Sequence, residues 1–240
     1  MATKMANNED LAQNMEVAVK IPFDEKEIEA LISRPQLTSW NRCGVILTHG
    51  AGGDMFHEHL QLLVKFLCNA GILCLRFTMK TPNFMYRVKC FAVVVDFLRQ
   101  SQQYQVNHCI IGGRSMGARV AAEIASTLSK KKKFIIGLLC LSYPLHPVRK
   151  TSEQRLSSIL PLRIPTLFIS GTQDAMCQQE LMMSALGRLN CNWSIHWVEG
   201  GDHALTIKGE EGVSHTKQEI FEDIGNVVVL WAQSVFMGER

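Results

Sequence analysis

The chain has 240 residues, of which 47% are hydrophobic and 20% are charged. This length and composition are those of a folded protein with a full core, and they exclude a largely disordered chain. The net charge of +3 gives no reason to expect a nucleic-acid or membrane partner. The sequence contains no run of about 18 uncharged apolar residues, so we expect no transmembrane helix. Residues 1–14 are polar, and we expect no secretory signal there.

Hydrophobic patterning predicts a hairpin followed by alternating strands and helices. The hairpin is expected at residues 16–23 and 28–33, with a turn at 24–26. Buried strands are then expected at residues 44–48, 72–77, 108–112, 134–142, 165–170 and 193–198. Helices are expected at residues 57–70, 86–100, 116–129, 178–189 and 216–236, with a short one at 152–159.

Continuous apolar strands that alternate with amphipathic helices are typical of a parallel sheet covered on both faces. The predicted fold class is therefore α/β, with a mostly parallel central sheet and an antiparallel N-terminal hairpin. We expect one domain over residues 15–240, preceded by a flexible N-terminus at residues 1–14.

Eight cysteines are spread along the chain without a CxxC pair. Most of them stand inside apolar runs, as Cys74 and Cys140 do. We therefore expect small buried side chains with free thiols, and neither a disulfide framework nor a zinc site. Free thiols favour a reducing compartment, so we expect a cytoplasmic or nuclear location.

Residues 113–117, Gly-Arg-Ser-Met-Gly, match the G-x-S-x-G pattern between an apolar strand and an alanine-rich helix. This pattern is typical of a nucleophile elbow, a sharp turn that exposes a serine hydroxyl at the end of a sheet. The N-terminus of the following helix directs free N–H groups at a developing oxyanion. The sequence therefore predicts Ser115 as a nucleophile. A serine in a tight turn without chemistry is the alternative.

An acid and a histidine follow Ser115 in chain order, each just after a predicted strand. Asp174 follows the strand at 165–170, and His203 follows the strand at 193–198. The loops that follow the carboxyl ends of parallel strands lie at one edge of the sheet, where a nucleophile, a base and an orienting acid can meet. We expect His203 to be the base and Asp174, rather than the adjacent Asp202, to be the acid. The alternatives are a helix cap for Asp174 and a surface loop position for His203.

The loop at residues 49–53, His-Gly-Ala-Gly-Gly, follows the first buried strand, where a second oxyanion donor is expected. We assign the backbone N–H groups of Ala51 and Met116 to an oxyanion hole. Six further residues are candidates for contact with substrate: His49, Gly50, Gly52, Arg76, Arg114 and Tyr143. Loop packing is favoured over a base role for His49, and a structural ion pair over carboxylate binding for the two arginines.

No metal or cofactor is expected. His57 and His59 stand two apart and face different sides of a predicted helix. The sequence also lacks the glycine-rich motifs of dinucleotide and P-loop sites.

These motifs resemble the α/β-hydrolase superfamily over roughly residues 15–238. The resemblance implies Ser115 as nucleophile, His203 as general base and then acid, and Asp174 as the residue that orients it. More narrowly, residues 47–51, 75–78, 112–117 and 142–146 are similar to the family of testis-expressed protein thirty. That family includes a subunit of a histone acetyltransferase complex and lies near the dienelactone hydrolases.

Two functions are consistent with these residues. The first is a serine hydrolase that cleaves esters or thioesters of small or exposed acyl substrates, because about 20 residues between Pro144 and Pro165 leave no room for a large lid. The second is a catalytically silent interaction module on the same fold. An intact serine, aspartate and histidine set favours the enzyme. The expected partner is a small-molecule acyl substrate, and the sequence leaves open a monomer, a weak homodimer or a protein partner.

Overall fold

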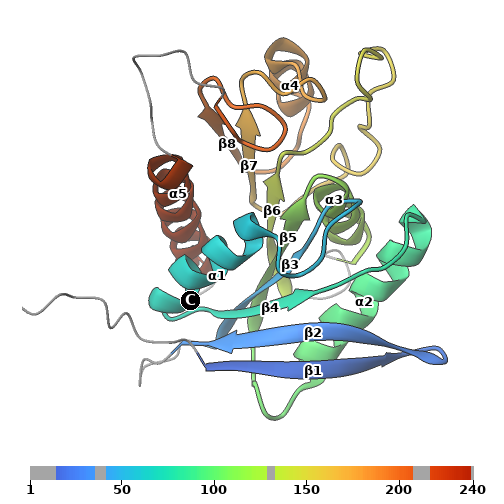
Figure 1. Ribbon diagram of the computed structural model, residues 1–240, viewed down its shortest axis with the longest axis vertical. Coiled ribbons are helices and arrows are strands. Elements are labelled where there is room, and N and C mark those ends of the chain that lie inside the picture. Colours follow the sequence, from blue (N-terminus) through green and yellow to red (C-terminus); the bar gives the residue numbers. More distant parts are fainter. Residues whose placement is uncertain (1–14, 36–41, 129–132, 208–216, 239–240) are drawn as a thin grey trace, which may run out of the picture.

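The computed structural model describes residues 15–35, 42–128, 133–207 and 217–238, and Figure 1 shows how their elements are arranged. The flexible segment predicted at residues 1–14 lies outside these ranges. Residue 129, the predicted end of one helix, and residue 216, the predicted start of another, also lie outside them.

Eight strands of the described residues form a sheet in the order β1-β2-β4-β3-β5-β6-β7-β8. β1 (Met15–Phe23) and β2 (Lys26–Arg34) form an antiparallel hairpin, and β2 also pairs antiparallel with β4. All the remaining pairs are parallel. The other strands are β3 (Cys43–Thr48), β4 (Leu73–Phe77), β5 (His108–Arg114), β6 (Ile135–Leu141), β7 (Thr166–Gly171) and β8 (Trp193–Val198). The predicted fold class is confirmed.

Helices cover both faces of this sheet (Figure 1). α1 (Glu58–Asn69) and α5 (Lys217–Gly238) pack on one face, where their apolar side chains share a core with the sheet. α2 (Phe84–Gln100), α3 (Met116–Leu128) and α4 (Gln179–Leu186) pack on the other face around a second core. Because both faces are covered, every residue of β3, β4, β6 and β7 is buried, which explains their continuous apolar runs.

The prediction of a helix at residues 152–159 is wrong. This segment runs through single turns, and the whole connection from β6 to β7 contains no helix. The Arg155 N–H donates to Leu145 O at 2.7 Å, and the Tyr143 hydroxyl donates to Arg155 O at 2.7 Å. Backbone groups that a helix would need are thus bound to the loop after β6. This short connection, which is described throughout and contains no helix, supplies no large lid between β6 and β7.

By length and composition alone, α5 is the one described helix that could cross a membrane, although we expected none. Its most apolar 18-residue window has a mean hydropathy of 1.3. Here α5 packs beside α1, and side chains such as Phe221, Ile224 and Val228 are buried in the core. A core helix passes the same length and composition test, so the test does not assign α5 to a membrane.

Candidate active site

Ser115 lies in the sharp turn between β5 and α3. Its φ of 52° is in the left-handed region, which is costly for a residue other than glycine and is most often retained at functional sites. The turn packs tightly against the end of β3, since a Cβ on Gly117 would lie 2.5 Å from His49 O. The glycine that ends the G-x-S-x-G pattern is therefore required by this close approach.

The three residues predicted at strand ends form one hydrogen-bonded chain. Ser115 Oγ lies 2.9 Å from His203 Nε2, and His203 Nδ1 lies 2.8 Å from Asp174 Oδ2. A carboxylate only accepts, so Nδ1 carries the proton and Nε2 accepts from the serine hydroxyl. The Asp174 side chain is fully buried, whereas the His203 ring is 25% exposed. The His203 ring, which is accessible from solvent, therefore links the buried Asp174 carboxylate to the Ser115 hydroxyl.

The loops after β7 and β8 are packed together, which brings Asp174 to His203. A Cβ on Gly171 would lie 2.0 Å from Gly201 O, so these loops touch backbone to backbone. Gln173 N–H donates to Gly201 O at 2.8 Å. Asp174 Oδ1 accepts from Met176 N–H at 2.8 Å, which leaves Oδ2 for the histidine. Asp174 does not cap α4, whose N-cap residue is Gln178.

The adjacent Asp202 shapes its own loop. Its Oδ1 accepts from Ala204 N–H at 2.8 Å and from Thr206 N–H at 3.1 Å. The structure therefore places Asp174, and not Asp202, on the imidazole.

Arg114 holds the backbone of the histidine loop. Its Nη2 donates to His203 O at 3.0 Å, and burial lowers the pKa of its guanidinium. The contact is a hydrogen bond to a carbonyl and not the structural ion pair that we favoured from the sequence. Arg114 is the one arginine candidate that touches the chain of site residues.

Three other candidates for substrate contact are buried structural residues. Arg76 is 3% exposed and pairs with Glu16, as the favoured interpretation of an ion pair expected. Tyr143 is 1% exposed, and its hydroxyl is bound to Arg155 O. His49 is fully buried; its Nδ1 donates to Gly50 O at 2.7 Å, and its Nε2 accepts from Met79 N–H at 2.9 Å. Burial lowers the pKa of His49 to about 4, so the ring is neutral at pH 7 and packs the loop.

The loop after β3 runs beside the serine. A Cβ on Gly50 would lie 3.4 Å from Ser115 Cβ, and the next residues, Ala51 and Gly52, are exposed. Within the described part of the chain, the N–H groups of Ala51 and Met116 have no hydrogen-bond acceptor. Met116 is the first residue of α3, where N–H groups have no partner inside the helix. Both groups are available to a ligand.

Sequence reasoning missed Arg87, a residue of α2 that is 1% exposed. Its guanidinium donates to Gly50 O and Ala51 O, so it binds the loop beside Ser115. A signal was present in the sequence, because helical spacing puts Arg87 on the same face as the apolar Phe91, Val94 and Leu98. A charge on the buried face of a helix requires a polar partner in the core.

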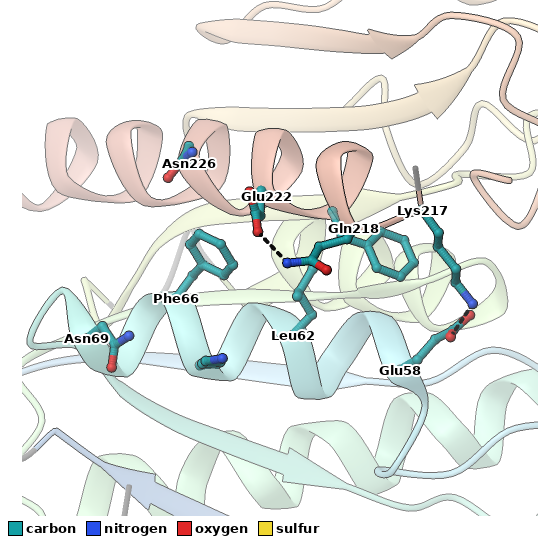
Figure 2. Close-up of a pocket in the computed structure, with 10 residues that line it drawn as sticks. Glu58, Leu62, Phe66, Asn69, Lys217, Gln218, Glu222 and Asn226 are labelled. Atoms are coloured by element: carbon teal, nitrogen blue, oxygen red, sulfur yellow. Dashed lines mark hydrogen bonds and ion pairs between the residues drawn. The ribbon is translucent and has the colours of Figure 1, made fainter. Parts of the chain in front are cut away.

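A cavity of about 720 Å³ lies elsewhere, between α1 and α5 (Figure 2). Leu62, Phe66 and Phe221 give it apolar walls, and Glu58 with Lys217 closes one end. None of the predicted site residues lines this cavity. The candidate active site is therefore defined by the chemistry at the sheet edge and not by this hollow.

The sheet order and the serine turn between β5 and α3 define an α/β-hydrolase fold. A family model described as alpha/beta hydrolase domain matches residues 41–229, and the chain belongs to this family.

Solved structures share the fold at low sequence identity. A dienelactone hydrolase from Anabaena variabilis is 16% identical, with a TM-score of 0.72 over 93% of this chain and 99% of that one. An esterase from Pyrococcus furiosus is 16% identical, with a TM-score of 0.73 over 98% of this chain and 95% of that one. A serine hydrolase without a lid from Xanthomonas campestris is 15% identical, with a TM-score of 0.70 over 93% and 96%. At such identities the likeness establishes the fold.

Proposed function

We propose that this protein is a serine hydrolase that cleaves ester or thioester bonds. The observation that carries the proposal is the hydrogen-bonded chain from Ser115 Oγ through His203 to the buried Asp174 carboxylate. A nucleophile, a base and an orienting acid in this order are the arrangement that activates a serine for acyl transfer.

In the proposed mechanism, Ser115 Oγ attacks the acyl carbon while His203 Nε2 takes the hydroxyl proton. The carbonyl oxygen becomes an oxyanion that accepts from the N–H groups of Ala51 and Met116. As the tetrahedral intermediate collapses, the imidazolium gives its proton to the departing alcohol or thiol. Water then attacks the acyl-enzyme with His203 again as base, and the acid product leaves with Ser115 restored. Asp174 stabilises the imidazolium in both halves.

The absence of a large lid between β6 and β7 favours a small acyl group, or an acyl group exposed on a larger molecule. The names of the structural neighbours, an esterase, a dienelactone hydrolase and a lidless serine hydrolase, point to the same reaction class. We also propose that the chain belongs, more narrowly, to the family of testis-expressed protein thirty, which four of its segments resemble. Because that family includes a subunit of a histone acetyltransferase complex, a catalytically silent interaction module is the alternative function if no turnover is found.

Hydrolysis of 4-nitrophenyl acetate and of an S-acetyl thioester tests the proposal. Ser115→Ala should lower kcat by about 10⁴-fold or more, because it removes the nucleophile while the fold stays intact. Ser184→Ala, an exposed serine on α4, is the matched control and should keep wild-type turnover. Equal turnover in Ser115→Ala would contradict the assignment. A folded wild type without turnover on either ester would favour the interaction module.

A further inference from the structure

Arg87 is a buried cation without an acidic partner among the described residues. A charge removed from water needs other polar groups to compensate the lost hydration. The guanidinium finds them in four backbone carbonyls. Nη1 donates to Gly50 O at 2.9 Å, Nη2 donates to Ala51 O at 3.0 Å and Met79 O at 3.1 Å, and Nε donates to Thr81 O.

These bonds fasten the loop after β3 to the loop after β4. The Gly50 carbonyl is held twice, because His49 Nδ1 also donates to it at 2.7 Å. Two donors occupy both lone pairs of that oxygen. The His49 ring is fixed in turn by the Met79 N–H, which donates to Nε2 at 2.9 Å. The Gly50 peptide therefore has little freedom to rotate.

The direction of these carbonyls sets the direction of the next N–H groups. In a trans peptide the C=O and the N–H point to opposite sides, and the bonds after Gly50 and Ala51 are both trans. Arg87 holds the two carbonyls on the core side. The N–H groups of Ala51 and Gly52 consequently point to the exposed side of the loop. The loop passes Ser115 at Gly50, where an added Cβ would lie 3.4 Å from Ser115 Cβ.

We propose that Arg87 is a positioning residue for the oxyanion hole, because it directs the Ala51 N–H group toward the oxygen of an acyl group bound at Ser115. The inference rests on the proposed serine hydrolase function. It depends on geometry and not on charge alone, because four carbonyls in different directions need the planar fork of a guanidinium. The ammonium of a lysine is a single point charge and cannot hold all four.

The test compares Arg87→Lys and Arg87→Met with wild type in the hydrolysis of 4-nitrophenyl acetate. Both should lower kcat by about 10²-fold, the effect of losing one oxyanion donor. KM and the acid limb of the pH profile should not change, because neither the ground-state contacts nor His203 is altered. Arg99→Met, on the exposed face of the same helix, is the control and should match wild type. Thermal denaturation gives the folded fraction by which each rate is divided.

A double-mutant cycle separates positioning from a general structural role. Ala51→Pro removes the Ala51 N–H, and combining it with Arg87→Lys should lower kcat no further than either change alone. Additive losses would overturn the inference, and so would wild-type kcat in Arg87→Lys. A variant that loses only melting temperature, with normal kcat in its folded fraction, would also overturn it. Those outcomes leave Ser115-dependent turnover of the wild type intact, whereas failure of the proposed function removes that turnover itself.

Discussion

Asp174 and Asp202 both lie close to His203 in the fold, yet only one of them touches its ring. Asp174 Oδ2 is 2.8 Å from His203 Nδ1, while Asp202 Oδ1 accepts two N–H groups of its own loop. A carboxylate on Nδ1 fixes the tautomer and stabilises the imidazolium that forms when the serine proton moves. An aspartate that only closes a turn does neither.

Replacing each aspartate by asparagine distinguishes these roles. Asp174→Asn should lower kcat by about 10⁴-fold, because an amide can donate to Nδ1 and favour the wrong tautomer. Asp202→Asn keeps an oxygen that can accept from Ala204 N–H and Thr206 N–H, so turnover should stay within a few-fold of wild type. Steady-state kinetics on 4-nitrophenyl acetate measures both. A larger loss of kcat in Asp202→Asn than in Asp174→Asn would show that Asp202 is the acid.

The sequence predicts that Ser115, Asp174 and His203 meet at one edge of the sheet, because topology sets where the strands of a parallel sheet end. In the structure the three side chains lie within hydrogen-bond distance of one another. The sequence could not decide whether a side chain at such an edge faces the site or the core. Tyr143 and Arg76 turn inward to partners that are 12 and 60 positions away in the chain. Contacts of this kind arise from tertiary packing, which no local pattern records.

The two helices on one face of the sheet cross at Gly225 of α5. A Cβ added there would lie 2.6 Å from the ring of Phe66 on α1, closer than atoms can approach. The ring is half-buried between the helices and beside the cavity of Figure 2. The absence of a side chain at this position therefore sets how closely α5 approaches α1.

Gly225→Ala should destabilise the fold by about 1–3 kcal/mol, because the helices or the ring must move apart. Gly238→Ala is the matched control, since nothing lies within 4 Å of a Cβ added at the end of the same helix. Urea unfolding measures both free energies. If Gly225→Ala is as stable as wild type, α1 and α5 are not packed as closely as described.

Most elements could be predicted from the sequence because apolar runs and helical spacing repeat along the chain. The conformation of residues 152–159 could not be predicted, because their backbone is hydrogen-bonded to the loop after β6 and local propensity carries no information about such contacts. The start of α2 was placed two residues late, at 86 instead of Phe84. Its signal is the Asn83 side chain, which accepts from Tyr86 N–H at 2.9 Å and caps the helix.

Two buried histidines, His49 and His59, should make the stability of the fold depend on pH. Burial lowers the pKa of His49 and of His59 to about 4. His59 is 3% exposed, and neither of its ring nitrogens makes a hydrogen bond among the described residues. The nearest charge is the Glu58 carboxylate, which lies 4.0 Å from Nε2. In the unfolded chain a histidine titrates near its ordinary pKa of about 6.5, so the unfolded state binds more protons between these values. The contribution of these two neutral histidines to the free energy of unfolding is fully present above pH 6.5, and it is lost as the pH falls toward 4.

Each of these two histidines should cost about 2 kcal/mol of unfolding free energy between pH 7.5 and pH 5. His59→Phe should remove the contribution of His59, because a phenyl ring in the same edge-to-face contact with Phe221 does not titrate. Urea unfolding at the two pH values gives the comparison. If wild type and His59→Phe lose the same free energy on acidification, His59 is not the source of the acid sensitivity.

Intact mass after exposure to a small fluorophosphonate tests whether Ser115 is an activated nucleophile. The reagent phosphonylates a serine only where a base and an oxyanion hole assist the attack. We predict one adduct on the wild type and none on Ser115→Ala, with both proteins folded. A folded wild type that gains no adduct, or an adduct that persists in Ser115→Ala, would show that Ser115 is not an activated nucleophile.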